Sequence, residues 1–191
     1  MTKSPVRVSA FSTLFALGSL AVPMLAASAA AKPAAQAAPV TVALKAADGA
    51  KLTVTGTSTI HGWHADAKAV TITAELSKAG DVLAAIQSQG LSKLALVAGA
   101  GTLHSPEGKS MDHNIAKALE ADKFPSISFS LSSYELQGTT VTAKGTLSIH
   151  GQSKEVELPG TLIAKDGGVA VKGSLAFKMT DYGVKPPTAM L

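Results

Sequence analysis

The second half of the chain is a succession of segments in which apolar and polar residues alternate. In the first of them Ile127, Phe129 and Leu131 alternate with serines. A period of two places successive side chains on opposite faces of a strand. Glycine-containing turns separate the segments, and such a series is typical of a β-sandwich or a β-barrel. The predicted strands are 126–136, 140–149, 153–164 and 169–180.

The first half of the domain follows the same pattern with more interruptions. Residues 40–45 and 51–56 flank the turn Ala47-Asp48-Gly49, which predicts a hairpin. Further strands are expected over 70–76 and 91–99. Between them, residues 81–89 place Val82, Ala85 and Ile86 on one side, which predicts a short helix.

A second helix is expected just before the strand at 126. Ile115, Ala118 and Leu119 recur at spacings of three and four, which places them on one helix face. Ser110 and Asp112 are residue types that cap the free N–H groups of a first turn. The residue before a proline avoids the helical region, so Pro125 ends the helix. We expect this helix to lie against, or to plug, a curved sheet.

The N-terminus has the three parts of a secretory signal peptide. Lys3 and Arg7 precede an apolar run from residue 8 to 25, and small residues follow. We expect residues 1–29 to be a cleaved signal peptide, 30–39 an Ala/Pro-rich linker and 40–191 a single domain. The apolar run is long enough for the alternative of a membrane anchor, but Pro23 and the Ala-rich exit favour cleavage and a periplasmic protein.

Charge and cysteine content exclude several classes of protein. The formal net charge of +4 falls to +2 without the leader, which carries two of the positive charges and no acidic residue. No arginine follows Arg7, so the guanidinium forks typical of nucleic-acid surfaces are missing. The chain has no cysteine, so no disulfide stabilises its fold and no lipidated cysteine anchors it to a membrane.

No set of residues predicts catalysis or a metal site. There is no G-x-S-x-G motif, and the serines of 126–132 follow the polar face of a strand. His61 and His64 are three residues apart and His150 could approach from another strand, but no cysteine or carboxylate spacing completes a ligand set. We expect His61 and His150 to form hydrogen bonds at strand ends, and Asp112 and His113 to act as a capping pair.

The inward positions leave the nature of the interior open. Small residues such as Ala74, Ala143 and Gly173 are interspersed with leucine, valine and phenylalanine. Such a set either packs tightly or leaves an apolar tunnel. Around eight strands are enough to close a barrel that can hold one small ligand.

The order of motifs resembles that of the YceI-like family of bacterial periplasmic proteins. Asp112 starts a helix that leads into Lys123-Phe124-Pro125-x-Ile127-x-Phe129, and Gly145-x-Leu147-x-Ile149-x-Gly151-x-x-Lys154 follows. The resemblance covers residues 40–191. It implies an all-β protein, an extended lipocalin-like antiparallel β-barrel with one or two short helices.

The resemblance also implies a binding or carrier protein, not an enzyme, that holds an isoprenoid or other long-chain amphiphile in an apolar tunnel and needs no cofactor. His61, Asp112 and His113 are then candidates for polar contacts at its mouth. Its expected partners are the apolar lipid, transiently a membrane, and a second copy in a homodimer. The expected ligand-binding positions are Ile60, Trp63, Leu96, Ile115, Leu119, Phe129, Leu131, Leu147 and Phe177.

A second hypothesis is a non-enzymatic module of the cell envelope with a packed core. It would dock a partner through the helix near residue 110 or through an open edge strand. A small hydrolase or metal enzyme is the third hypothesis, and the missing catalytic set argues against it.

Overall fold

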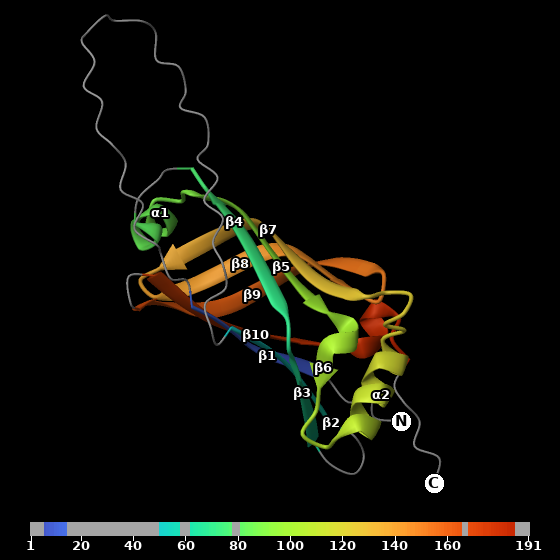
Figure 1. The fold of residues 1–191 in the computed structure, drawn as a ribbon. Helices are drawn as coiled ribbons and strands as arrows, with labels where there is room; N and C mark the ends of the chain where they lie inside the picture. Colours follow the sequence, from blue (N-terminus) through green and yellow to red (C-terminus); the bar gives the residue numbers. More distant parts are fainter. Residues whose placement is uncertain (1–5, 15–49, 58–61, 78–80, 166–167, 186–191) are drawn as a thin grey trace, which may run out of the picture.

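The computed structural model describes residues 6–14, 50–57, 62–77, 81–165 and 168–185. These residues form one ten-stranded antiparallel sheet that curls into a half-barrel (Figure 1). The predicted all-β class with short helices is confirmed. The strand order is β4-β5-β7-β8-β9-β10-β1-β2-β3-β6. The bounds are β1 Val6–Leu14, β2 Lys51–Thr57, β3 Gly62–Ala67, β4 Val70–Leu76, β5 Leu91–Gly99, β6 Leu103–His104, β7 Ser126–Gln137, β8 Thr140–Ile149, β9 Gln152–Lys165 and β10 Gly168–Phe177.

The four C-terminal strands β7 to β10 form the meander that the alternation predicts. Gly138 and Gly151 occupy the first two turns with φ of 61° and 72°, a region that favours glycine. β10 ends at Phe177, whereas the sequence pattern predicted a strand to residue 180. The chain instead enters the 3-10 turn η2 (Met179–Tyr182), which buries Tyr182 edge-on against the Phe177 ring at 5.1 Å between centroids.

Strand β1 lies within the segment predicted to be a signal peptide. It pairs with β10 on one side and with β2 on the other, and both pairings are antiparallel. Cleavage after residue 29 stays a prediction. The linker 30–39 and the predicted strand 40–45 lie outside the described residues. Within the described ranges, no helix is long and apolar enough to cross a membrane.

Helix α1 (Val82–Gln87) connects β4 to β5, as the spacing predicts. The Asp81 carboxylate accepts a hydrogen bond from the backbone N–H of Ala84 at 2.8 Å and thereby caps the first turn. The face made of Val82, Ala85 and Ile86 is buried. The helix contacts β10, so it bridges strands that lie far apart in the sheet order.

Helix α2 (Lys109–Ala118) lies beside the sheet, against β6 and the 3-10 turn η1 (Ala100–Thr102). Its predicted capping is wrong. Gly108 is the N-cap, with φ of 97°, and no side chain caps the helix, because the Asp112 carboxylate binds the preceding loop. Ile115 and Leu119 are partly buried against the core.

Candidate functional site

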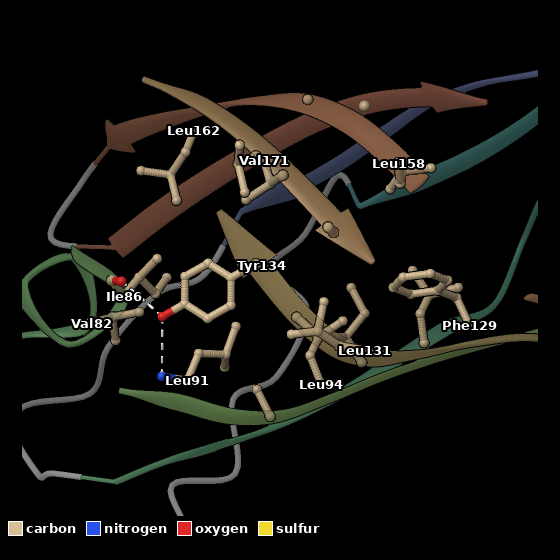
Figure 2. A pocket seen from close by; sticks show the side chains of 17 residues that line it. Val82, Ile86, Leu91, Leu94, Phe129, Leu131, Tyr134, Leu158, Leu162 and Val171 are labelled. Atoms are coloured by element: carbon tan, nitrogen blue, oxygen red, sulfur yellow. Dashed lines mark hydrogen bonds between the residues drawn. The ribbon is translucent and has the colours of Figure 1, made fainter. Parts of the chain in front are cut away.

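An apolar cavity of about 100 Å³ lies inside the curl of the sheet (Figure 2). Residues of β4, β5, β7, β8, β9, β10 and α1 line it. Their alternation places leucine, isoleucine and valine side chains toward this space and polar side chains toward solvent. Tyr134 contributes the hydroxyl, and the other lining side chains are hydrocarbon or glycine. The cavity can therefore accept apolar groups.

Strand register explains which side chains reach the cavity. Leu96 of β5 lies opposite Phe129 of β7 and opposite Ile72 of β4, so one row of apolar side chains crosses three strands. On the far wall, Gly160 and Gly173 are register partners of β9 and β10. A Cβ atom at Gly160 would lie 2.6 Å from the carbonyl oxygen of Lys172, so glycine permits this close approach. Small residues keep the interior open here.

Tyr134 ties the cavity wall to α1. Its hydroxyl donates to the carbonyl oxygen of Ile86 at 2.8 Å and accepts from the backbone N–H of Leu91 at 3.4 Å. Burial raises the pKa of the phenol, and the hydrogen bond from Leu91 opposes this shift. The group therefore stays neutral at physiological pH. Since its hydroxyl already has partners, it leaves the surrounding wall apolar.

A β-bulge brings Tyr134 to the inner face. The register of β7 against β8 shifts between Leu131 and Ser133. Ile127, Phe129 and Leu131 face inward before the bulge, and Tyr134 and Leu136 do so after it. Two consecutive serines, Ser132 and Ser133, interrupt the alternation there. This interruption was the available sequence signal for the inward position of Tyr134.

Three predicted ligand-binding residues line this cavity: Leu96, Phe129 and Leu131. Val82 and Ile86 of α1 also line it, together with Leu91 and Leu94 of β5. The apolar face of α1 was visible in the sequence, but its position at the end of the cavity depends on tertiary packing.

The structure places five other predicted ligand-binding residues outside the cavity lining. Leu147 is buried in β8, in register with Phe129. Trp63 lies over Gly56, where a Cβ atom would overlap its indole. Phe177 packs against Tyr182, and Ile115 and Leu119 pack on the core from α2. Ile60 and His61 lie outside the described residues.

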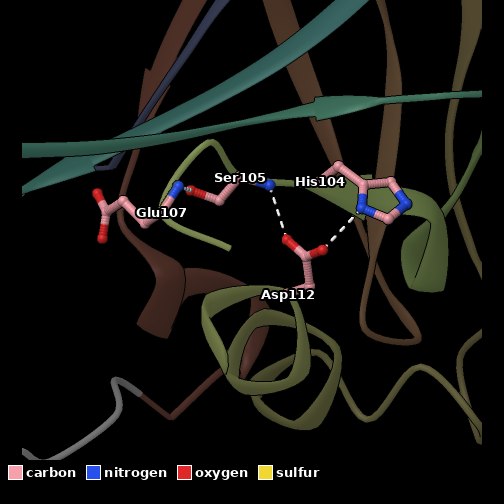
Figure 3. A network of polar contacts seen from close by, with 4 residues as sticks. All are labelled: His104, Ser105, Glu107 and Asp112. Atoms are coloured by element: carbon pink, nitrogen blue, oxygen red, sulfur yellow. Dashed lines mark hydrogen bonds and ion pairs between the residues drawn. The ribbon is translucent and has the colours of Figure 1, made fainter. Parts of the chain in front are cut away.

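Of the two predicted polar residues of α2, Asp112 belongs to a separate network (Figure 3). Asp112 accepts from the Ser105 backbone N–H at 2.7 Å and lies 2.7 Å from the Nδ1 atom of His104. The backbone hydrogen bond from Ser105 and the adjacent His104 lower the pKa of the Asp112 carboxyl. The backbone N–H of Glu107 donates to the Ser105 hydroxyl. His113 is exposed. The carboxylate thus fixes the loop before α2.

His150 forms a hydrogen bond at the end of β8, as predicted. Its Nδ1 atom lies 3.2 Å from the carbonyl oxygen of Tyr182. Its Nε2 atom is buried and lies 3.2 Å from the Glu120 carboxylate, but makes no hydrogen bond. Its ring also contacts Phe124, with 4.6 Å between centroids. This cluster joins the end of the α2 region to the sheet. Among the described residues, no group of three or more His, Asp or Glu side chains could hold a metal ion.

Comparisons with known proteins find solved structures and a family model that are similar to this chain. A crystal structure of Campylobacter jejuni YceI protein superposes with a TM-score of 0.51 at 19% identity, covering 63% of this chain and 70% of the other. Burkholderia cenocepacia BcnA gives a TM-score of 0.45 at 14% identity, covering 59% and 86%. No curated protein matches the sequence. The model of the YceI-like domain matches residues 56–190, and this protein therefore belongs to the YceI-like family.

Proposed function

We propose that this protein is a periplasmic carrier that holds an isoprenoid or another long-chain amphiphilic lipid by its apolar part. The observation that supports the proposal most strongly is that the cavity wall is apolar. The polar side-chain group on it is the hydroxyl of Tyr134, which already has hydrogen-bond partners. Burial of hydrocarbon supplies roughly 25 cal/mol per Å² and requires no specific polar residue. Family membership supports a binding protein and does not identify the ligand.

The volume of the cavity limits how much of a lipid it can hold in this conformation. At about 100 Å³ it is smaller than typical ligand pockets of roughly 300–1,000 Å³. We propose that the cavity takes one end of the chain, and that the remainder requires movement of the lining side chains. The small volume also favours the second candidate, an envelope module that works without a ligand.

Paired substitutions on β5 test the carrier function. Leu94 lines the cavity, whereas Val97 faces outward with 42% of its surface exposed. We expect Leu94→Trp to fill the cavity and abolish uptake of an added polyprenol or quinone. Val97→Trp should take up the lipid like the unmodified protein. Equal uptake by both variants, in folded protein, contradicts a role for this cavity.

A further inference from the structure

We infer that the cavity binds its ligand with the hydrocarbon end first, and that α1 is the end wall against which the terminal methyl group stops. The inference rests on the proposed function and adds the orientation of the ligand and the residues that limit its depth. Val82 and Ile86 are the α1 side chains that line the cavity, and they are 1% and 6% exposed.

Buried side chains of α1 cover this end of the cavity. Figure 2 shows Val82, Ile86 and Tyr134 at one end of the cavity and Phe129 at the other. Phe129 and Tyr134 belong to the same strand, five residues apart, which corresponds to roughly 16 Å at the rise of a strand. The helix is fixed at both of its ends, by the Asp81 cap and by the Tyr134 hydroxyl on the Ile86 carbonyl.

The chemistry of this end excludes a polar headgroup. The Tyr134 hydroxyl is the side-chain polar group of the lining, and both Ile86 and Leu91 already bind it. A charged or hydroxylated head placed against α1 would lose its water without gaining a partner, which is costly. A terminal methyl group loses nothing there. Since no lining residue offers the head a free partner, the head lies outside the cavity, and the α1 side chains that cover this end leave the opposite end for it.

The orientation can be tested directly with the full chain and a long 1-alkanol that carries bromine on its terminal carbon. We expect the anomalous signal of bromine, in a crystal of the complex, beside Val82 and Ile86. A signal at the Phe129 end overturns the inference but leaves the carrier function standing. Failure of every alkanol to bind contradicts the carrier function itself.

The end wall is tested by truncation of Ile86. A series of 1-alkanols of increasing length should bind about fourfold more tightly for each methylene that becomes buried, until the chain reaches α1. In Ile86→Ala the gain should continue to a longer chain than in the unmodified protein. The matched control is Ile149→Ala, which removes the same atoms from a buried residue of β8 outside the cavity lining. If in both variants binding stops tightening at the same alkanol length as in the unmodified protein, α1 is not the end wall.

Discussion

At the scale of single residues, Tyr134 contributes both to the stability of the fold and to the shape of the cavity. Its ring fills part of the wall and its hydroxyl holds the backbone of Ile86 and Leu91. Neither role was visible in the alternation of β7, because a bulge near Ser133 reverses which residues face inward. A strict period of two would have placed Ser133 in the cavity and Tyr134 in solvent.

We predict that Tyr134→Phe lowers the free energy of unfolding by about 0.5–1.5 kcal/mol, because the hydrogen bond from the hydroxyl to the Ile86 carbonyl is lost while the backbone N–H of Gln89 still donates to that carbonyl. Urea denaturation measures the change. Tyr134→Leu serves as a comparison, since it removes the ring as well and should cost more. An unchanged unfolding free energy in Tyr134→Phe would show that the hydroxyl does not hold α1.

Asp112 predicts a dependence of stability on pH. The backbone N–H of Ser105 and the neighbouring His104 lower its pKa in the folded state. Because the folded-state pKa is lowered, the ionised carboxylate stabilises the fold at every pH above the ordinary carboxyl pKa of about 4. This contribution disappears as the pH falls through the lower pKa of the folded state. Thermal unfolding of Asp112→Asn should therefore show a deficit at pH 7 that vanishes in strong acid. A deficit that is the same at every pH would contradict this assignment.

At the scale of elements, the regular strands were predictable and the irregular connections were not. β8 has the bounds that its alternation predicts, and α1 buries the predicted face. The capping of α2 was predicted incorrectly, because Asp112 forms a hydrogen bond with Ser105 in place of a cap, and sequence spacing alone does not distinguish these two partners. For the candidate site, alternation identified Leu96, Phe129 and Leu131, while residues brought in by α1 required the tertiary structure.

The pairing of β2 leads to a prediction about the residues that precede it. β2 pairs with β3 on one edge and with β1 on the other. The predicted strand 40–45, joined to β2 by a short turn, could pair only with the edge that β1 holds. We expect a chain lacking residues 1–29 to keep its fold, because 40–45 can replace β1 beside β2.

A chain lacking residues 1–49 should unfold at a lower temperature, because β2 and β10 would both lose a neighbouring strand. Circular dichroism during heating measures the unfolding temperature of both truncated chains. If the longer truncation is as stable as the shorter one, residues 40–45 contribute no strand.

At the scale of the whole molecule, a single curled sheet has two consequences. Its inner face gathers apolar side chains from strands far apart in the sequence, and α1 covers one end of the resulting space. The core outside the cavity lining is buried: Leu147 and Ile149 of β8 are 7% and 5% exposed. The molecule thus combines a buried core with an apolar cavity beside it.

Native mass spectrometry of the protein purified from its natural host tests the central claim most directly. The carrier account predicts an added mass that organic solvent extracts and that analysis identifies as an apolar lipid. It also predicts that the extracted protein regains the mass when polyprenol or quinone is added. Protein that carries no lipid, and that takes up neither compound while folded, would contradict the account.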